Sequence, residues 1–189
     1  MTREAAIDLL RSTPLMPSRV RQVAVPPTAR ALSTLSQIDY ADAFLVEIGS
    51  AEDRTAQQWA RAILEDAPII TRSALRWVWF TLGLQLGSTL PDRSVLGWRV
   101  RRSTPDFVLL AARSPVGLSA EVLLERQQQT LLFATFVQHE NPIARAVWAG
   151  IEPVHRPAVR YLLERVSPDT RPSARRGAPP RDAPSASGR

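Results

Sequence analysis

The hydrophobic positions between residues 94 and 138 fall into four short runs, separated by residues typical of turns. The runs cover residues 95–101, 107–113, 118–125 and 130–138. In the first run Trp98 and Val100 alternate with Arg99 and Arg101, which is the period of a strand with one buried face. Ser114-Pro115-Val116-Gly117 suits a β-turn with proline at its second position. The pattern predicts an antiparallel meander, preceded by a strand over residues 42–48.

Two helices are predicted between the early strand and the meander. Thr55 and Gln58 have the spacing of a capping box, and apolar residues then recur at helical spacing until Pro68. Residues 73–86 form a second candidate helix, for which Gly87 is a suitable stop. Its residues Trp77 and Phe80 lie beside Arg72 and Arg76, a combination compatible with a membrane interface. We favour burial of this helix instead.

A long helix should end the folded part of the chain. Asn141 is a good N-cap, and Pro142 fits the first helical position. Six apolar residues then form a stripe that we expect to face the concave side of the sheet: Ile143, Val147, Ile151, Val154, Ala158 and Leu162. Pro153 interrupts this stripe, so the sequence predicts a kink, or a break into two helices, near residues 150–153.

The two ends of the chain differ from its middle. Residues 4–11 could form a short helix, and residues 19–36, with Pro26-Pro27, suggest an extended lead-in. After residue 166 the chain contains almost no large apolar residue, so nothing there offsets the entropy of ordering. We therefore expect an N-terminal extension over residues 1–18, one domain over residues 19–166 and a disordered tail over residues 167–189.

Composition excludes several kinds of chemistry. The chain contains no cysteine, and all 24 basic residues are arginine, which rules out thiolate nucleophiles, disulfides and lysine Schiff bases. Half of the net charge of +6 lies in the tail, around Arg171, Arg175, Arg176 and Arg181. Such a tail could contact nucleic acid or another anionic surface weakly. We favour a solvated extension and expect no specific nucleic-acid partner.

No segment has the 18 or more apolar residues of a membrane span, and the first 17 residues lack a continuous apolar region like that of a signal peptide. The expected location is therefore cytoplasmic. The sequence does not predict an oligomeric state.

The order of the predicted elements resembles the START-like, or SRPBCC, superfamily, with short phrases at Ile38–Phe44, Leu96-Gly97-Trp98, Trp148 and Pro153–Arg156. Within it, residues 20–166 resemble a bacterial, actinobacterial-type family of unknown function. The resemblance implies an α+β helix-grip fold, in which a curved antiparallel sheet wraps around the C-terminal helix and encloses a hydrophobic cavity. Members of the superfamily include lipid and hormone carriers and cyclase or aromatase enzymes, so the resemblance carries over no catalytic residue.

Few side chains are candidates for catalysis. His139 begins a metalloprotease-like phrase, but Ile143 stands where the second histidine must lie, so we predict no metal site and no cofactor. His155 could orient a ligand or move a proton near neutral pH, although a packing role is the simpler interpretation. Asp39 and Asp42 could divide acid and base roles, although a solvated loop is the simpler interpretation for them.

The aromatic residues suggest where a ligand would lie. Trp98, Phe136 and Trp148 fall on strand and helix segments that should face each other, and His155 would add a polar group at the mouth of the cavity. These four residues are the predicted ligand-binding residues. The favoured function is binding of a hydrophobic small molecule, such as a lipid, polyketide or aromatic compound. The alternative is a cyclase or isomerase in which His155 or Asp42 acts as acid or base.

Overall fold

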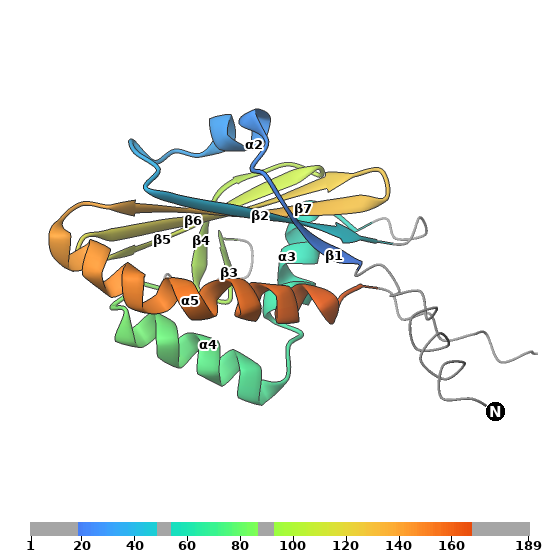
Figure 1. Cartoon of the computed structure of the whole chain (residues 1–189). Helices are drawn as coiled ribbons and strands as arrows, with labels where there is room; N and C mark the ends of the chain where they lie inside the picture. The colour runs from blue at the N-terminus through green and yellow to red at the C-terminus, as the bar shows by residue number, and fades with distance from the viewer. Residues whose placement is uncertain (1–18, 49–53, 87–92, 168–189) are drawn as a thin grey trace, which may run out of the picture.

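Seven antiparallel strands form one open sheet in the computed structural model, which describes residues 19–48, 54–86 and 93–167 (Figure 1). The order across the sheet is β1-β2-β7-β6-β5-β4-β3. The strands are β1 (Val20–Val23), β2 (Tyr40–Glu47), β3 (Ser94–Val95), β4 (Trp98–Ser103), β5 (Phe107–Ser114), β6 (Leu118–Gln127) and β7 (Thr130–His139). The expected α+β class, with an antiparallel meander and a C-terminal helix, is confirmed.

The meander follows the predicted runs, with one difference. The first run consists of two strands, because Leu96 and Gly97 both adopt positive φ angles, of 47° and 92°, and turn the chain between β3 and β4. Consecutive positive φ angles suit the twist of a two-residue hairpin. At the predicted Ser114–Gly117 turn, the Gly117 amide donates to the Ser114 carbonyl at 3.0 Å.

Helices pack on both faces of the sheet, so most residues of β5, β6 and β7 are buried on both sides. On the convex face lies α2 (Pro27–Leu32), which was not predicted, since residues 19–36 were expected to be an extended lead-in. Pro27 fits this helix because the first helical position needs no N–H donor. In Figure 1, α2 lies on one side of the sheet and α4 and α5 on the other.

The predicted capping box at Thr55 is confirmed. The Gln58 amide donates to Oγ1 of Thr55, and the Thr55 amide donates to Oε1 of Gln58, at the start of α3 (Ala56–Leu64). The next helix, α4 (Ile69–Thr81), begins four residues earlier than predicted, directly after Pro68. It also ends earlier, because Gln85 instead forms a β-bridge with Arg113.

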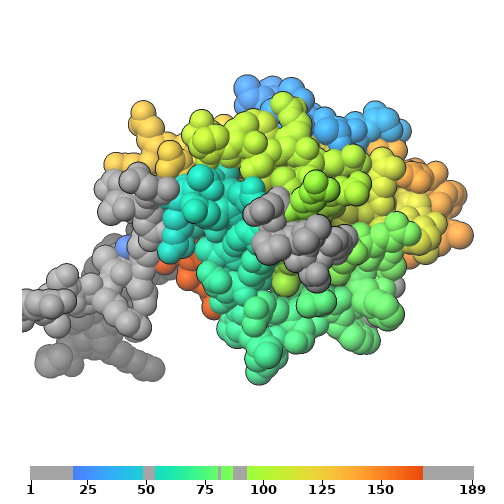
Figure 2. All heavy atoms as spheres, turned by 180° about the vertical axis from the view of Figure 1, so that it is seen from behind, coloured from blue at the N-terminus to red at the C-terminus, as the bar shows by residue number. Residues whose placement is uncertain are grey.

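The expectation that the second helix is buried is wrong for the side that carries Trp77 and Phe80. In α4 the side chains of Trp77 and Phe80 are 68% and 79% exposed. Leu75 and Trp79, on the opposite side of α4, pack against the core. The outer side of α4 is therefore an apolar surface, and this helix forms the lower edge of the molecule in Figure 2.

The final helix, α5 (Pro142–Glu164), begins as predicted, because Oδ1 of Asn141 accepts a hydrogen bond from the Ala144 amide at 2.9 Å. It continues past Pro153 and Pro157, so the expected break into two helices is wrong. Its buried side is also rotated from the predicted stripe: Ala144, Trp148, Val159, Leu162 and Leu163 are buried. Ile143 and Val154 are 66% and 63% exposed.

No helix within the described ranges is long and apolar enough to cross a membrane. The predicted helix at residues 4–11, the stop at Gly87 and most of the arginine-rich tail lie outside the described residues.

Candidate functional site

A cavity of about 390 Å³ lies between the concave face of the sheet and the helices α4 and α5. Its walls are almost entirely apolar. Leu75 and Trp79 come from α4, Val122 and Phe133 from the sheet, and Ile151 and Leu162 from α5. Among the described lining residues there is no carboxylate and no guanidinium group. The cavity therefore suits an uncharged, largely apolar molecule.

The cavity opens to solvent between α4 and α5. Val78, Val154 and Tyr161 line it, and each of these side chains is also exposed. The two helices lie beside each other below the sheet in Figure 1. The exposure of Val154 thus has a structural reason, since this residue lies at the opening and not in the packed core. Exposed apolar side chains at a groove are a common mark of a ligand or partner site.

A polar cluster lies at the wall of the cavity near Trp148. Nε2 of His155 lies 3.4 Å from Oδ2 of Asp42, which is a long distance for a hydrogen bond. The same Oδ2 accepts a hydrogen bond from the Tyr40 hydroxyl group, with 2.7 Å between the two oxygens. Nε of Arg156 donates to the Tyr40 hydroxyl oxygen at 3.1 Å. A buried carboxylate is thus connected to the surface through tyrosine and to the cavity through histidine.

The alternation of β2 places Asp42 in this cluster. Tyr40, Asp42 and Phe44 are two residues apart, so they share the concave face, on which Tyr40 and Phe44 belong to the core. On α5, Trp148 and His155 are seven residues apart and lie on one side of the helix. The ring centroid of Trp148 lies 4.8 Å from that of Tyr40 and 5.3 Å from that of His155. This aromatic packing holds the imidazole near the carboxylate.

Burial and the neighbouring side chains act in opposite directions on the pKa of Asp42. Its side chain is almost completely buried, and burial by itself would raise the pKa of the carboxyl group. The nearby His155 imidazole and the Tyr40 hydroxyl group outweigh burial, so the pKa of Asp42 lies below its ordinary value. The pKa of Tyr40 is raised by its own burial and by its hydrogen bond to Asp42. Asp42 is therefore an anion at neutral pH, and Tyr40 is a neutral donor.

Several polar atoms in the cavity wall are buried without a hydrogen-bond partner among the described residues. They include Thr135 Oγ1, Trp98 Nε1 and Trp148 Nε1. Leaving such an atom unpaired costs about 1–3 kcal/mol. A ligand hydroxyl or amine that reached one of these atoms would recover part of this cost.

Asp39 and Asp42 do not act as a pair. Oδ2 of Asp39 accepts a hydrogen bond from the His139 amide at 2.7 Å, which lowers the pKa of Asp39. Asp42 instead lies within β2 and contacts Tyr40 and His155. The solvated-loop interpretation is therefore wrong for Asp42, and the two carboxylates serve different partners.

The structure brings together three of the four predicted ligand-binding residues. Trp98, Trp148 and His155 line the cavity. Phe136 does not, because it lies in the convex-face cluster, while its neighbours Thr135 and Val137 face the cavity. The expected orientation of Phe136 is therefore wrong. β7 is buried on both faces, so its sequence could not show which alternate residues face α5.

Sequence reasoning missed Tyr40, Thr135 and Arg156. The spacing of Tyr40 and Asp42 in a strand was the one available signal for the tyrosine, because residues two apart share a face. Arg156 looks like an ordinary charged residue of a helix. Its hydrogen bond to Tyr40, 116 residues earlier in the chain, depends on how α5 crosses the sheet. No cluster of three or more histidine, cysteine, aspartate or glutamate residues within the described ranges could hold a metal ion.

The fold and the cavity define an α+β protein in which a C-terminal helix crosses one face of an open antiparallel sheet. No family model matches the sequence, and no curated protein matches it. Among solved structures, it is similar to the solution NMR structure of a protein from Arthrobacter aurescens at 17% sequence identity. The match covers 75% of this chain and 99% of the other, with a TM-score of 0.35.

Proposed function

We propose that this protein binds a small hydrophobic molecule in the cavity between α4, α5 and the concave face of the sheet. The observation that carries this proposal is an apolar cavity of about 390 Å³ whose wall contains a few polar side chains, among them Thr135, Trp148 and His155. Sites for small ligands are typically about 300–1,000 Å³ in volume and have this mixture of wall groups.

The size of the cavity narrows the class of ligand. Its volume lies at the small end of the typical range, which favours a single acyl chain or a compact aromatic or polyketide compound over a lipid with two long chains. The uncharged wall favours a neutral ligand. Thr135, Trp148 and His155 suggest that one hydroxyl, carbonyl or amine group of the ligand points toward β7 and α5.

The proposal includes a fold assignment. We infer that the sheet and α5 form a helix-grip fold of the START-like type, in which the sheet curves around the C-terminal helix. The supporting observations are the position of α5 over the concave face, the two helices α3 and α4 that follow β2, and the cavity beneath them. In this interpretation α4 borders the opening through which the ligand enters.

Native mass spectrometry of freshly purified protein should show a bound organic species. A direct test uses the neutral fluorescent probe N-phenyl-1-naphthylamine, whose emission rises in an apolar site. Ala158 lies on α5 and lines the cavity, so Ala158→Phe should fill part of the volume and weaken probe binding by about tenfold, because the ligand loses apolar contact.

Ala149→Phe is the matched control, because Ala149 lies exposed on the same helix and does not line the cavity. It should bind the probe as the wild type does. Equal probe binding by the wild type and by both variants would contradict the proposal, because the probe would then lie elsewhere.

The contact between His155 and Asp42 favours one alternative, a cyclase- or isomerase-type enzyme that works in the same cavity. A carboxylate that orients an imidazole beside an apolar site is a suitable arrangement for general acid–base catalysis. In this alternative His155 transfers the proton and Asp42 positions it. Turnover of a polyketide-like or aromatic test substrate by the wild type, with loss in both His155→Gln and Asp42→Asn, would favour the enzyme. Recovery of unchanged substrate from every sample would argue against the enzyme, and ligand binding would remain the proposed function.

A further inference from the structure

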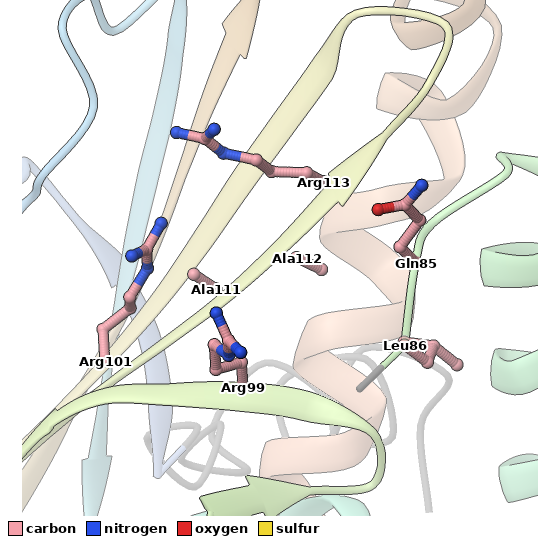
Figure 3. Close-up of a pocket in the computed structure, with 7 residues that line it drawn as sticks. All are labelled: Gln85, Leu86, Arg99, Arg101, Ala111, Ala112 and Arg113. Carbon is pink, nitrogen blue, oxygen red and sulfur yellow. The ribbon is translucent and has the colours of Figure 1, made fainter. Parts of the chain in front are cut away.

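A second hollow lies on the edge of the sheet, outside the apolar cavity. It has a volume of about 360 Å³ and is lined by three arginine residues, Arg99, Arg101 and Arg113, together with Gln85 and small residues of β5. Figure 3 shows the side chains of these residues around the hollow. This group is called the arginine pocket below.

The strand geometry explains why the three arginines gather. Arg99 on β4 pairs with Ala111 on β5, and Gln85 forms a bridge with Arg113 two residues further along β5. The edge of β5 is thus paired first with β4 and then with Gln85, and the hollow lies between these partners. The register shift between Val100 and Arg102 leaves Arg101 as an extra residue. Arg99 and Arg101 are two residues apart and share a face of β4, and the side chain of Arg101 lines the same hollow as those of Arg99 and Arg113 (Figure 3).

Among the described residues, the three arginines of the arginine pocket are not paired with a carboxylate. Within the part of the chain that the structure describes, none of the three arginines forms a hydrogen bond or an ion pair through its side chain. Glu121 on β6 pairs in register with Ala111 and is an acidic residue on this face. Its carboxylate accepts hydrogen bonds from Ser33 Oγ and from the amide and hydroxyl groups of Thr34, so it keeps its charge but forms no ion pair with the three arginines. Three cations around one hollow repel one another, and an anion between them would remove this repulsion.

We propose that the arginine pocket binds a ligand that carries a doubly charged phosphate group. Guanidinium groups present paired N–H donors that match the oxygens of phosphate, and here they project from paired strands. Ala111 and Ala112 leave space at the floor of the pocket, and the Gln85 side-chain amide offers a further donor. The site is separate from the apolar cavity, so it does not depend on the function proposed above.

The test is a titration followed by NMR of the arginine Nε–Hε signals and of the amides of β4 and β5. The probes are inorganic phosphate, pyrophosphate and adenosine monophosphate at about pH 7.5, where phosphate monoesters are doubly charged. Sodium chloride at the same ionic strength is the reference. The proposal expects saturable shifts at Arg99, Arg101 and Arg113 that chloride does not produce. Tighter binding of inorganic phosphate or pyrophosphate would identify a free-phosphate site, and tighter binding of adenosine monophosphate a nucleotide site.

Two triple variants with the same loss of charge separate a site from general attraction. Arg99→Gln/Arg101→Gln/Arg113→Gln should weaken pyrophosphate binding by about tenfold or more, because charge-assisted hydrogen bonds are lost. Arg72→Gln/Arg76→Gln/Arg165→Gln removes three other arginines of α4 and the end of α5 and should change binding by less than about twofold. Arg113→Lys keeps the charge but not the paired donors, so its affinity should fall between these two.

All six positions lie outside the buried core, so thermal melts should show that both triple variants remain folded. Equal weakening by the two triples would overturn the proposal, because only overall charge would then matter. The absence of saturable shifts would overturn it as well. So would binding of duplex DNA at these residues without binding of the small phosphates, because the surface would then serve nucleic acid.

Discussion

Replacement of Asp42 tests the polar cluster most directly. Asp42 is 3% exposed. Its Oδ2 accepts a hydrogen bond from the Tyr40 hydroxyl group at 2.7 Å and lies 3.4 Å from Nε2 of His155. Asp42→Ala removes the acceptor of the Tyr40 hydrogen bond and the anion beside His155. Asp42→Asn removes the charge but keeps an oxygen that the Tyr40 hydroxyl group can reach.

The expected loss follows from these contacts. A hydrogen bond to a charged group contributes about 1.5–3 kcal/mol. Removing the carboxylate also relieves the cost of its burial, which offsets part of this loss. We therefore expect Asp42→Ala to lower the free energy of unfolding by about 2 kcal/mol at pH 7. Asp42→Asn should lower it by about 1 kcal/mol, because a neutral hydrogen bond to Tyr40 can remain.

The loss of stability caused by Asp42→Ala should become smaller as the pH falls. The pKa of Asp42 in the folded protein lies below its ordinary value, and in the unfolded chain it is about 3.9. The stability that the ionised carboxylate contributes is therefore fully present above about pH 4 and is lost as the pH falls through the folded pKa. The difference in the free energy of unfolding between the wild type and Asp42→Ala should be largest at pH 7 and should become smaller as the pH falls below about 4.

Urea unfolding followed by tryptophan fluorescence, at several pH values between about 7 and 3, measures this difference. Asp106→Asn is the control, because Asp106 is exposed and its nearest cationic partner, Arg126, lies 4.0 Å away. It should change the stability by less than about 0.5 kcal/mol. An Asp42→Ala protein as stable as the wild type at pH 7, or a loss that stays constant across the pH range, would refute the reasoning.

The packing of α5 and the start of α3 give two more predictions. Leu162 is buried against the core, so Leu162→Ala should cost about 2–5 kcal/mol in chemical unfolding, whereas Ile143→Ala should cost less than about 0.5 kcal/mol because Ile143 is exposed. Equal losses at the two positions would mean that α5 packs through the originally predicted stripe. Thr55→Ala should lower the stability by about 1 kcal/mol, because the Gln58 amide loses its acceptor. Thr55→Ser, which keeps the hydroxyl oxygen, should retain most of that stability in the same unfolding assay, and a Ser variant as unstable as the Ala variant would argue against the cap.

The elements that sequence reasoning located correctly are those with local signals. The Thr55–Gln58 capping box and the Asn141-Pro142 start depend on residues within one helical turn, so the sequence alone contains them. The turn at Ser114–Gly117 and the apolar runs of the meander are local in the same sense. The short helix at Pro27 was missed because six residues that begin at the second of two prolines are too few to show a periodic signal.

The tertiary structure decided which face each element buries. β7 is apolar on both sides, so only the packing of α5 on one face and α2 on the other shows that Thr135 faces the cavity and Phe136 does not. On α5, two neighbouring stripes are apolar, and the one that contains Trp148 packs against the sheet. Asp42 and His155 are 113 positions apart in the chain, and their contact exists because α5 crosses the sheet at β2. Such contacts depend on packing between distant segments, for which a single sequence has no local pattern.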